Sequence, residues 1–299
     1  MDATSPAPNV RIALTADLHF GTRHAPGNDA TIQLVADLLA DPPDVLILGG
    51  DIGAGDDFRR CLELFQNLDC VKALVPGNHD IWVRPYDGRG DSWKVYTETL
   101  PAISRECGFH YLDEAPLILP SGPAVVGNIN WYDYSWAIDR LPEIFPDWQD
   151  RLSEKRFTRG QHNDRNFVRW PHTDETFTRL VAERLDRHLT DALARASQVL
   201  VVMHHPPLRS MLPTLETELP PDSWLWRAFS GNATVEARIE ADAARIPLVF
   251  CGHTHRQTDR THMGMRTVNI GGDYHFKRLM RVTWPTLEIE ATDFGERGE

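Results

Sequence analysis

The sequence predicts an α/β fold, a four-layer α/β/β/α sandwich in which helices flank two mixed sheets, with an aromatic-rich insertion. Three observations predict it. Short apolar, β-branched segments ending in turn residues recur along the chain, which is the pattern of buried strands. Helical periodicity lies between several of these segments, and the C-terminal part is rich in strand patterns. Alternation followed by a strand-rich end favours two sheets packed together over one open sheet.

The strands come in two sets. The buried strands that precede polar turns are expected at 11–15, 45–48, 72–75, 199–203 and 247–251. The strands of the C-terminal part are expected at 266–270, 279–284 and 286–292. These segments supply enough apolar surface for the paired inner faces of two sheets.

Three helices are predicted from apolar residues at helical spacing, over 30–39, 58–68 and 174–196. Asn28 and Asp29 are expected to cap the first. Thr173 is the expected N-cap of the last, and the acidic residues that follow it suit the first turn of a helix.

The chain is interpreted as a single domain over 1–299, because it shows neither an internal repeat nor a low-complexity linker. Two stretches fit the scaffold poorly. Residues 131–171 are rich in aromatic side chains, and residues 208–232 are punctuated by proline. Long irregular insertions are often lids or binding loops, while a surface excursion or an oligomer contact is the equal alternative.

Composition excludes several classes of protein. The formal net charge of −12 argues against an extended nucleic-acid partner, which would require a basic surface. The four cysteines form no CxxC pair, and such sparse cysteines indicate reduced thiols. No apolar run approaches the ~18 residues of a membrane span, and residues 1–10 carry no secretory pattern. A cytoplasmic protein without membrane contact is expected; homo-oligomerisation is left open.

Residues typical of metal ligands follow five of the expected strands. The segments are Asp17-Leu18-His19, Gly50-Asp51, Gly77-Asn78-His79-Asp80, His204-His205 and Gly252-His253-Thr254-His255. The carboxyl ends of strands in an open α/β sheet meet along one edge, where such proteins place their sites. Carboxylate, amide and imidazole donors together suit a pair of divalent first-row metals, which can act jointly on a phosphate ester.

The chemistry and spacing of these residues suggest which of them bridges the two metals and which chelate a single metal. A ligand that bridges two cations must be a carboxylate, and Asp51, after two glycines, is the natural choice. Asp17 and His19 lie two residues apart and therefore point to the same side of an extended segment. His253 and His255 repeat that spacing.

The ordered set Asp-x-His, Gly-Asp, Gly-Asn-His-Asp, His and Gly-His-x-His resembles the calcineurin-like metallophosphoesterase superfamily from Asp17 to His255. The resemblance implies two divalent metal ions, whose identity (Mn, Fe, Zn, Co or Ni) stays open. The implied ligands of the first are Asp17, His19, Asp51 and His255. Those of the second are Asp51, Asn78, His204 and His253.

The same resemblance implies roles around the metals. A hydroxide that bridges them would be the nucleophile. His79 would act near the leaving group as an acid or charge stabiliser, and Asp80 would orient His79. His205 would lie behind the ligands and is also a candidate substrate contact. The other histidines are not part of the resemblance: His188 is expected to be solvated on its helix, and His24, His162 and His275 are expected in ordinary surface roles, with an approach to the substrate as the alternative.

The chain resembles the bacterial small-phosphodiesterase side of the superfamily more than its protein phosphatases, because Gly50-Asp51 is not followed by their Asp-Arg pair. A small-molecule or nucleotide-type phosphodiester is therefore the expected substrate. The aromatic residues Trp131, Tyr132 and Tyr134 are expected to stack against it, with core packing as the equal alternative. Arg84, Arg89 and Lys94 are either contacts for a second phosphate or solvated charges.

Three alternatives remain open at this stage. A phosphomonoesterase or nucleotide pyrophosphatase would use the same core. A DNA exonuclease is disfavoured by the acidic net charge. A non-catalytic binding scaffold is disfavoured because every expected ligand position is filled.

Overall fold

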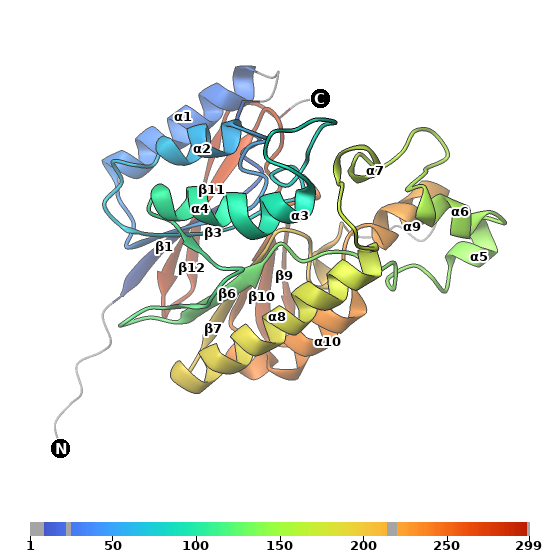
Figure 1. Ribbon diagram of the computed structural model, residues 1–299. Helices are drawn as coiled ribbons and strands as arrows, with labels where there is room; N and C mark the ends of the chain where they lie inside the picture. The colour runs from blue at the N-terminus through green and yellow to red at the C-terminus, as the bar shows by residue number, and fades with distance from the viewer. Residues whose placement is uncertain (1–8, 22–24, 214–219, 298–299) are drawn as a thin grey trace.

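The computed structural model describes residues 9–21, 25–213 and 220–297. Its centre is a pair of six-stranded sheets packed face to face (Figure 1). The first sheet has the order β12-β11-β1-β2-β3-β4. Its strands are β1 (Val10–Thr15), β2 (Val45–Gly49), β3 (Val71–Val75), β4 (His110–Tyr111), β11 (Lys277–Trp284) and β12 (Glu288–Phe294). Strands β1 to β4 are parallel, and β11 runs antiparallel to β1.

The second sheet has the order β5-β6-β7-β8-β10-β9. Its strands are β5 (Leu117–Ile118), β6 (Ala124–Asn128), β7 (Val199–Met203), β8 (Leu248–Cys251), β9 (Thr258–His262) and β10 (Met265–Asn269). The inner strands β6, β7, β8 and β10 are parallel, and β5 and β9 form antiparallel edges. Both sheets are therefore mixed, as the sequence predicts.

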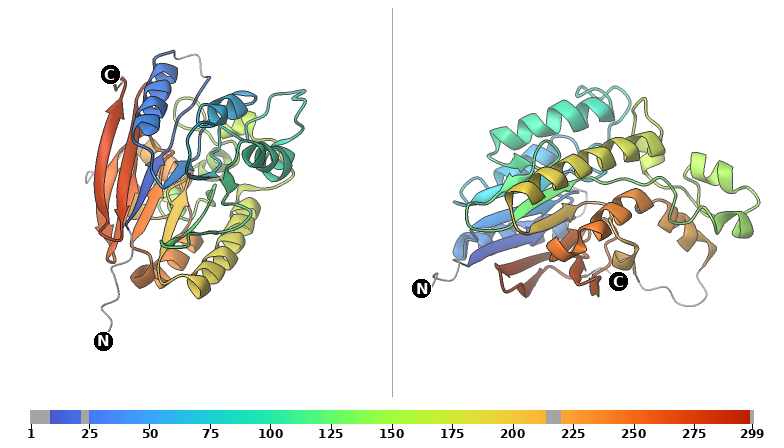
Figure 2. Two further views of the ribbon diagram at one scale, coloured as in Figure 1. Left: turned by 90° about the vertical axis from the view of Figure 1, so that its left-hand side faces the viewer. Right: turned by 90° about the horizontal axis from the view of Figure 1, so that it is seen from below.

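Helices cover the outer face of each sheet (Figures 1 and 2). On the first sheet lie α1 (Ala25–Ala40), α2 (Asp57–Glu63), α3 (Ser92–Lys94), a π-helical turn (Val95–Thr99) and α4 (Leu100–Glu106). The second sheet is covered by α8 (Asp174–Arg195) and α10 (Ala233–Ala241), which also pack on each other. Short 3-10 turns occur at Arg209–Met211 and Ala243–Arg245.

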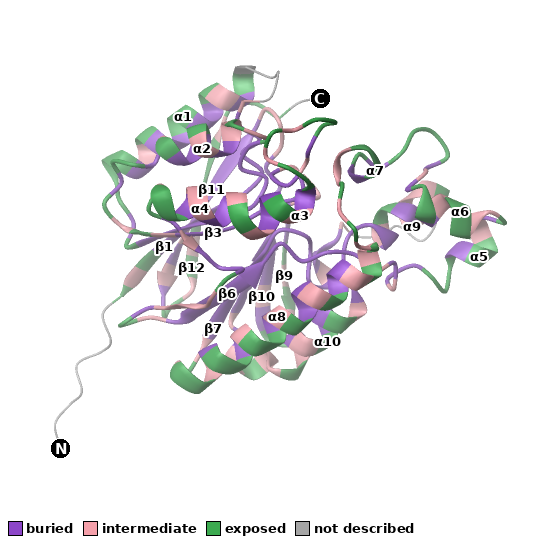
Figure 3. Cartoon of the chain, viewed as in Figure 1, coloured by how far each residue is buried: buried purple, intermediate pink, exposed green. Residues whose placement is uncertain are grey.

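The alternation of side chains along the strands builds the layers. Ile12 and Leu14 of β1 point between the sheets, where they join Val202 and Phe250 of the second sheet in one buried cluster. Ala13, between them, faces the helices instead. In Figure 3 the inner strands are almost entirely purple, the colour of buried residues, because both their faces are covered. The predicted four-layer sandwich is confirmed.

The predicted elements differ from the structure mainly at their ends. Helix α2 stops at Glu63 and continues to Leu68 only as turns. Asn28 and Asp29 lie inside α1, so the expected cap there is wrong; α1 begins before them, at Ala25. The N-cap of α8 is confirmed, because the Thr173 hydroxyl accepts a hydrogen bond of 3.2 Å from the Thr176 amide.

The two irregular stretches come together at one end of the molecule (Figure 1). Residues 131–171 contain α5 (Leu141–Ile144), α6 (Trp148–Ser153) and α7 (Asp164–Phe167), and residues 208–232 contain α9 (Pro221–Ala228). Helix α5 contacts both α6 and α9. We call these two stretches the insertion. They form a small helical unit beside the carboxyl ends of the central strands.

The four cysteines are free thiols. Within the described part of the chain, no helix has the length and apolar character needed to cross a membrane.

Candidate metal centre

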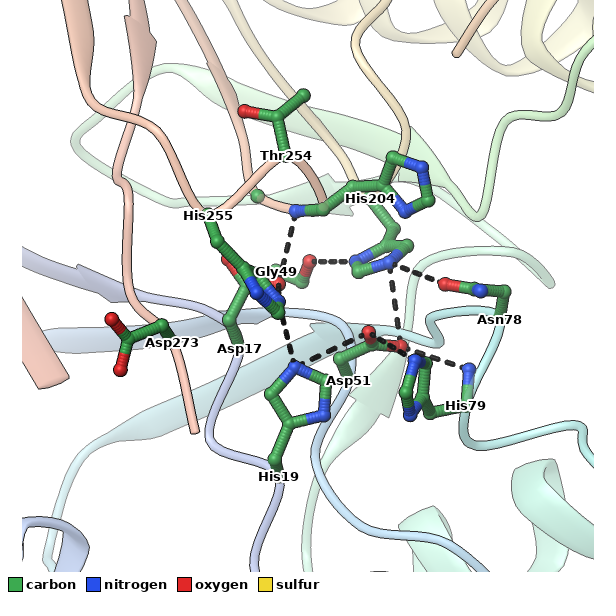
Figure 4. A network of polar contacts seen from close by, with 12 residues as sticks. Asp17, His19, Gly49, Asp51, Asn78, His79, His204, Thr254, His255 and Asp273 are labelled. Atoms are coloured by element: carbon green, nitrogen blue, oxygen red, sulfur yellow. Dashed lines mark hydrogen bonds and ion pairs between the residues drawn. The ribbon is translucent and has the colours of Figure 1, made fainter. Parts of the chain in front are cut away.

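The loops after β1, β2, β3, β7 and β8 converge at one edge of the sandwich (Figure 4). These loops carry all seven of the expected metal ligands. Because parallel strands in both sheets end on the same side, ligands separated by more than two hundred residues become neighbours. His19 and His255 give the clearest case, since their Nε2 atoms lie 2.9 Å apart.

The first group consists of Asp17, His19, Asp51 and His255, whose donor atoms all lie within 4.8 Å of one another. Asp51 Oδ2 lies 3.6 Å from His19 Nε2, and Asp17 Oδ1 lies 4.0 Å from His255 Nε2. This is the ligand set that the resemblance implies for one metal. The two imidazole nitrogens converge on the same space as the two carboxylates.

The second group is built around His204 and His253. His204 Nε2 lies 3.0 Å from the Asn78 amide oxygen and 3.3 Å from Asp51 Oδ1. Its Nδ1 lies 3.0 Å from the Gly49 carbonyl oxygen, which can only accept, so Nδ1 carries a proton and Nε2 is the ring nitrogen that would bind a metal. His205 joins His204 and His253 within the same 4.8 Å, so it is also within reach of this group.

Asp51 belongs to both groups. Its Oδ1 faces His204 and its Oδ2 faces His19, with the side chain almost fully buried. The amide of His79 donates to Oδ1 over 2.9 Å and helps to hold this orientation. A carboxylate with one oxygen in each ligand group has the arrangement that a metal bridge requires.

The loops that carry these ligands adopt strained backbone conformations. Five of the expected ligands have positive φ although none is glycine, at values from 41° to 72°: Asp17, His19, Asp51, His253 and His255. Non-glycine residues rarely adopt this region, and clusters of such residues are typical of functional sites. Gly50 and Gly77 allow the loops to approach, because a Cβ would lie 2.5 Å from His204 Nδ1 or 2.1 Å from Asp51 Oδ1.

Charges inside the cluster set the protonation states. Burial opposes ionisation of Asp51, but the imidazoles of His204, His79 and His19 outweigh it and hold the pKa of Asp51 well below its usual range. Burial lowers the pKa of His253 well below that of an ordinary histidine. Burial and neighbouring His204 lower the pKa of His205 to about 3. Burial opposes protonation of His204, but Asp51 outweighs it and raises the pKa of His204 to about 9. Neutral imidazoles and ionised carboxylates are the forms that bind metals, so a metal at His204 would displace a proton.

The residues present fit a dinuclear centre. Asp17 Oδ2, His19 Nδ1 and His205 Nε2 are buried without a hydrogen-bond partner among the described residues. Buried polar atoms are nearly always paired, so such atoms call for an explanation. Hard oxygen and borderline nitrogen donors in two adjoining groups suit two divalent first-row cations.

His79 is placed as expected, but Asp80 is not. The His79 Nε2 atom lies 3.8 Å from Asp51 Oδ2, beside the metal ligands. Asp80 accepts hydrogen bonds of 2.7–2.9 Å from the backbone amides of Ile52, Gly53 and Gly77. The interpretation that Asp80 orients His79 is therefore corrected: Asp80 ties together the loops after β2 and β3.

The expected aromatic wall is also corrected. Trp131 and Tyr132 are fully buried, and Tyr134 is 8% exposed. Trp131 Nε1 donates to Asp174 over 2.8 Å, and Tyr134 also donates to Asp174. The alternative of core packing describes Trp131 and Tyr132, because rings without exposed faces cannot stack against a substrate; Tyr134 keeps a small exposed area that lines a neighbouring cavity.

Two histidines differ from their expected surface roles. His162 is 6% exposed, and its ring centroid lies 6.4 Å from that of His253. His188 is half-buried on α8 rather than solvated. His24 lies outside the described residues.

Three residues that the sequence did not single out contact the ligand groups or His79. Trp82 stacks on His79 with ring centroids 3.6 Å apart, and Tyr274 packs on His19 at 4.4 Å. Asp164 accepts a hydrogen bond of 2.9 Å from the Asn78 side-chain amide. Tyr274 follows β10 and could have been found by extending the strand-end rule to that strand. Asp164 lies in the insertion, where no periodic signal marks it.

A cavity of about 590 Å³ lies between the first stretch of the insertion and the start of α8, beside Asp164. Its wall combines the rings of Trp148, Trp170 and Tyr134 with aliphatic and polar side chains. This volume is in the range of small-molecule sites.

Comparison with known proteins agrees with this geometry. A family model described as calcineurin-like phosphoesterase matches residues 10–257. The chain therefore belongs to the calcineurin-like phosphoesterases, a family of metal-dependent phosphoester hydrolases that bind a dinuclear metal centre. No curated protein sequence matches the chain.

Solved structures share the fold. Phosphopantetheinyl hydrolase from Mycobacterium tuberculosis is 21% identical, with a TM-score of 0.66 over 89% of this chain and 91% of that one. A dimetal phosphatase from Danio rerio is 14% identical, with a TM-score of 0.52 over 96% of this chain and 99% of that one. TT1561 of Thermus thermophilus is 12% identical, with a TM-score of 0.57 over 96% of this chain and 99% of that one. At these identities the likeness concerns the fold.

Proposed function

We propose that this protein is a dinuclear-metal phosphodiesterase that acts on a small-molecule or nucleotide-type substrate in the cytoplasm. The observation that carries the proposal is Asp51, whose two carboxylate oxygens face two separate ligand groups. In this assignment Asp17, His19, Asp51 and His255 hold one metal. Asp51, Asn78, His204 and His253 hold the other.

When bound, the metals supply Lewis-acid charge and lower the pKa of water so that hydroxide can attack phosphorus. The side chains around the centre supply the positioning and the proton transfer. The His79 imidazole, 17% exposed beside Asp51, is placed to stabilise or protonate a leaving-group oxygen. Asp80 holds the loop of His79 and Asn78 against the loop of Asp51. The stacked ring of Trp82 limits the motion of His79.

Charge favours a diester over a monoester. A monoester carries an additional negative charge, which enzymes commonly match with a bidentate arginine. Arg89, in the loop after His79, is committed to Asp87 and to the Trp82 carbonyl oxygen. Arg84 and Lys94 are exposed to solvent. These observations support a substrate whose phosphate needs no cation beyond the metals.

We place an uncharged organic group of that diester in the cavity of the insertion, which meets the centre at Asp164, a lining residue that also accepts a hydrogen bond from Asn78. Its ionic lining residues are two basic and three acidic: Lys155, Arg165, Asp164, Asp174 and Glu175. Lys155 is already bonded to Asp174. A second phosphate would therefore meet no excess of positive charge, whereas a neutral, partly apolar group suits the aromatic wall.

The decisive experiment compares hydrolysis of bis(p-nitrophenyl) phosphate and p-nitrophenyl phosphate by Mn²⁺-loaded protein, with EDTA as a control. Faster turnover of the diester, abolished by chelation, is expected. Faster turnover of the monoester would instead establish a phosphatase. A phosphopantetheinyl ester belongs in the second round of substrates, given the name of the mycobacterial structure with the same fold.

A further inference from the structure

The carboxylate of Asp164 connects the insertion to the candidate metal centre. Asp164, the first residue of α7, is 1% exposed, and its carboxylate makes four contacts with three parts of the chain. Its Oδ1 accepts from the Asn78 side-chain amide over 2.9 Å and from Trp82 Nε1 over 2.8 Å. Its Oδ2 accepts from the Tyr132 hydroxyl over 2.9 Å and lies 3.3 Å from His162 Nδ1.

The hydrogen bond between Asn78 and Asp164 determines the orientation of the Asn78 side-chain amide. The two ends of an asparagine amide have nearly the same shape, but one accepts and the other donates. An ionised carboxylate can only accept, so Asp164 draws the Nδ2 of Asn78 to itself. The amide oxygen must then point the other way, where it lies 3.0 Å from His204 Nε2. A metal can be bound by that oxygen but not by the NH₂ group.

The hydrogen bond from Trp82 to Asp164 also affects the position of His79. Trp82, which donates to the same Oδ1, stacks on His79 on one face and on Phe167 of α7 at 4.9 Å. The segment around α7 is tied to the segment after His79 along its length. The Val83 amide donates to the Phe167 carbonyl over 2.9 Å, and the Ser92 amide donates to the Arg169 carbonyl over 2.8 Å. Asp164 is therefore fixed relative to both Asn78 and His79.

We propose that Asp164 is a positioning residue for the second metal, which orients Asn78 and makes the affinity of that metal depend on the docking of the insertion. This inference rests on the proposed dinuclear centre, but it concerns metal affinity rather than turnover. It assigns to the insertion a part in forming the centre itself. The first group of ligands contains none of the partners of Asp164, so its metal is expected to be independent of this residue.

The test is calorimetric titration of metal-free protein with Mn²⁺, which resolves the affinities of the two sites. Asp164→Ala is expected to weaken one of the two sites by about 10- to 100-fold, the usual effect of removing a partner of a metal ligand, and to leave the other unchanged. Asp164→Asn keeps one oxygen that can accept from Asn78, and it is expected to retain more affinity than alanine does.

Asp174 provides a matched control. It too is a largely buried carboxylate that binds residues of the insertion, namely Trp131, Tyr134 and Lys155, and none of its hydrogen-bond partners in the described part of the chain is an expected metal ligand. Asp174→Ala is expected to lower the melting temperature as Asp164→Ala does, while both Mn²⁺ sites keep their affinity.

Two results would overturn the inference. One is an Asp164→Ala variant whose two sites both bind Mn²⁺ as the wild type does. The other is equal loss of affinity in the Asp164 and Asp174 variants, which would assign the effect to folding of the insertion. If the variants behave as expected and yet no diester is hydrolysed, the proposed function fails while the role of Asp164 stands.

Discussion

The indole ring of Trp82 lies against the imidazole of His79, with centroids 3.6 Å apart and planes 25° apart. The indole is itself held by its hydrogen bond to Asp164 and by stacking on Phe167. His79 is therefore confined between a fixed aromatic face and the carboxylate of Asp51. This confinement matters for catalysis, because a general acid works only when it is held within reach of its proton acceptor.

Replacing Trp82 tests the value of that confinement. Trp82→Leu removes the stacked face and is expected to lower kcat by about tenfold, a small share of the 10²–10⁴-fold that a positioned acid contributes. Trp82→Phe keeps a ring and is expected to lose less. Steady-state rates on bis(p-nitrophenyl) phosphate at equal metal content provide the measurement. Equal rates in the wild type and the leucine variant would remove Trp82 from the mechanism.

His79 and Asp51 should separate catalysis from metal binding. His79→Ala is expected to keep both metals and to lose about 100-fold in kcat, since its side chain lies beside the ligand groups rather than in them. Asp51→Asn is expected to lose metal and activity together, because an amide offers one accepting oxygen to two sites. Metal analysis after gel filtration, combined with rates, checks both. Wild-type turnover in the His79 variant would exclude it as the acid.

Asp80 should behave as a structural residue. Asp80→Ala leaves the amides of Ile52, Gly53 and Gly77 without their acceptor in a buried place. A buried unpaired group costs about 1–3 kcal/mol, so destabilisation of at least about 3 kcal/mol is expected, with weaker metal binding. Thermal unfolding and metal content measure these effects. A variant with normal melting temperature but the low kcat of His79→Ala would restore the idea that Asp80 orients His79.

The convergence of the expected metal ligands could be predicted because each lies shortly after a recognisable strand. Asp17, Asp51 and His204 follow continuous apolar runs, and parallel strands bring such positions to one edge whatever their separation in sequence. The layers of the fold were predictable for the same reason, since buried strands and α8 have strong periodicity.

Asp164 could not be predicted, because its importance depends on where an irregular segment folds back. Residues 131–171 have no regular spacing that fixes their path, and α7 is only four residues long. For a related reason the sequence could not decide between substrate stacking and core packing for Trp131 and Tyr132. Exposure in an insertion depends on what covers it, and here Asp164 and Asp174 provide buried partners for their polar atoms.

Stability should fall with rising pH because of Asp113, which belongs to neither ligand group. Burial raises the pKa of Asp113 from 3.8 to about 7, against the opposing effect of Arg184. Between these pH values the folded protein retains a proton that the unfolded chain releases. The free energy of unfolding therefore decreases from about pH 4 to about pH 7, by up to about 4 kcal/mol at 1.36 kcal/mol per pKa unit.

The matched comparison is Asp113→Asn, which keeps the shape and cannot ionise. Unfolding of both proteins in EDTA across pH 4 to 8 isolates this group, because other buried carboxyls contribute equally to both. The free energy of unfolding of the wild type, minus that of Asp113→Asn, should decrease from about pH 4 to about pH 7. A difference that stays constant would show that Asp113 is ionised throughout.

Gly77 provides the sharpest steric test of the centre. A Cβ at this position would lie 2.1 Å from Asp51 Oδ1 and 2.3 Å from the Asp51 amide nitrogen, closer than any real contact. Gly77→Ala must therefore displace the bridging carboxylate or the loop of Asn78, and loss of at least one metal is expected. Gly88, in the loop that follows, would place a Cβ in open space, so Gly88→Ala should change stability by less than about 0.5 kcal/mol. Bound Mn²⁺ per chain and melting temperature should be compared for the two variants. Two metals at wild-type affinity in Gly77→Ala would contradict the placement of Asp51 between the two ligand groups.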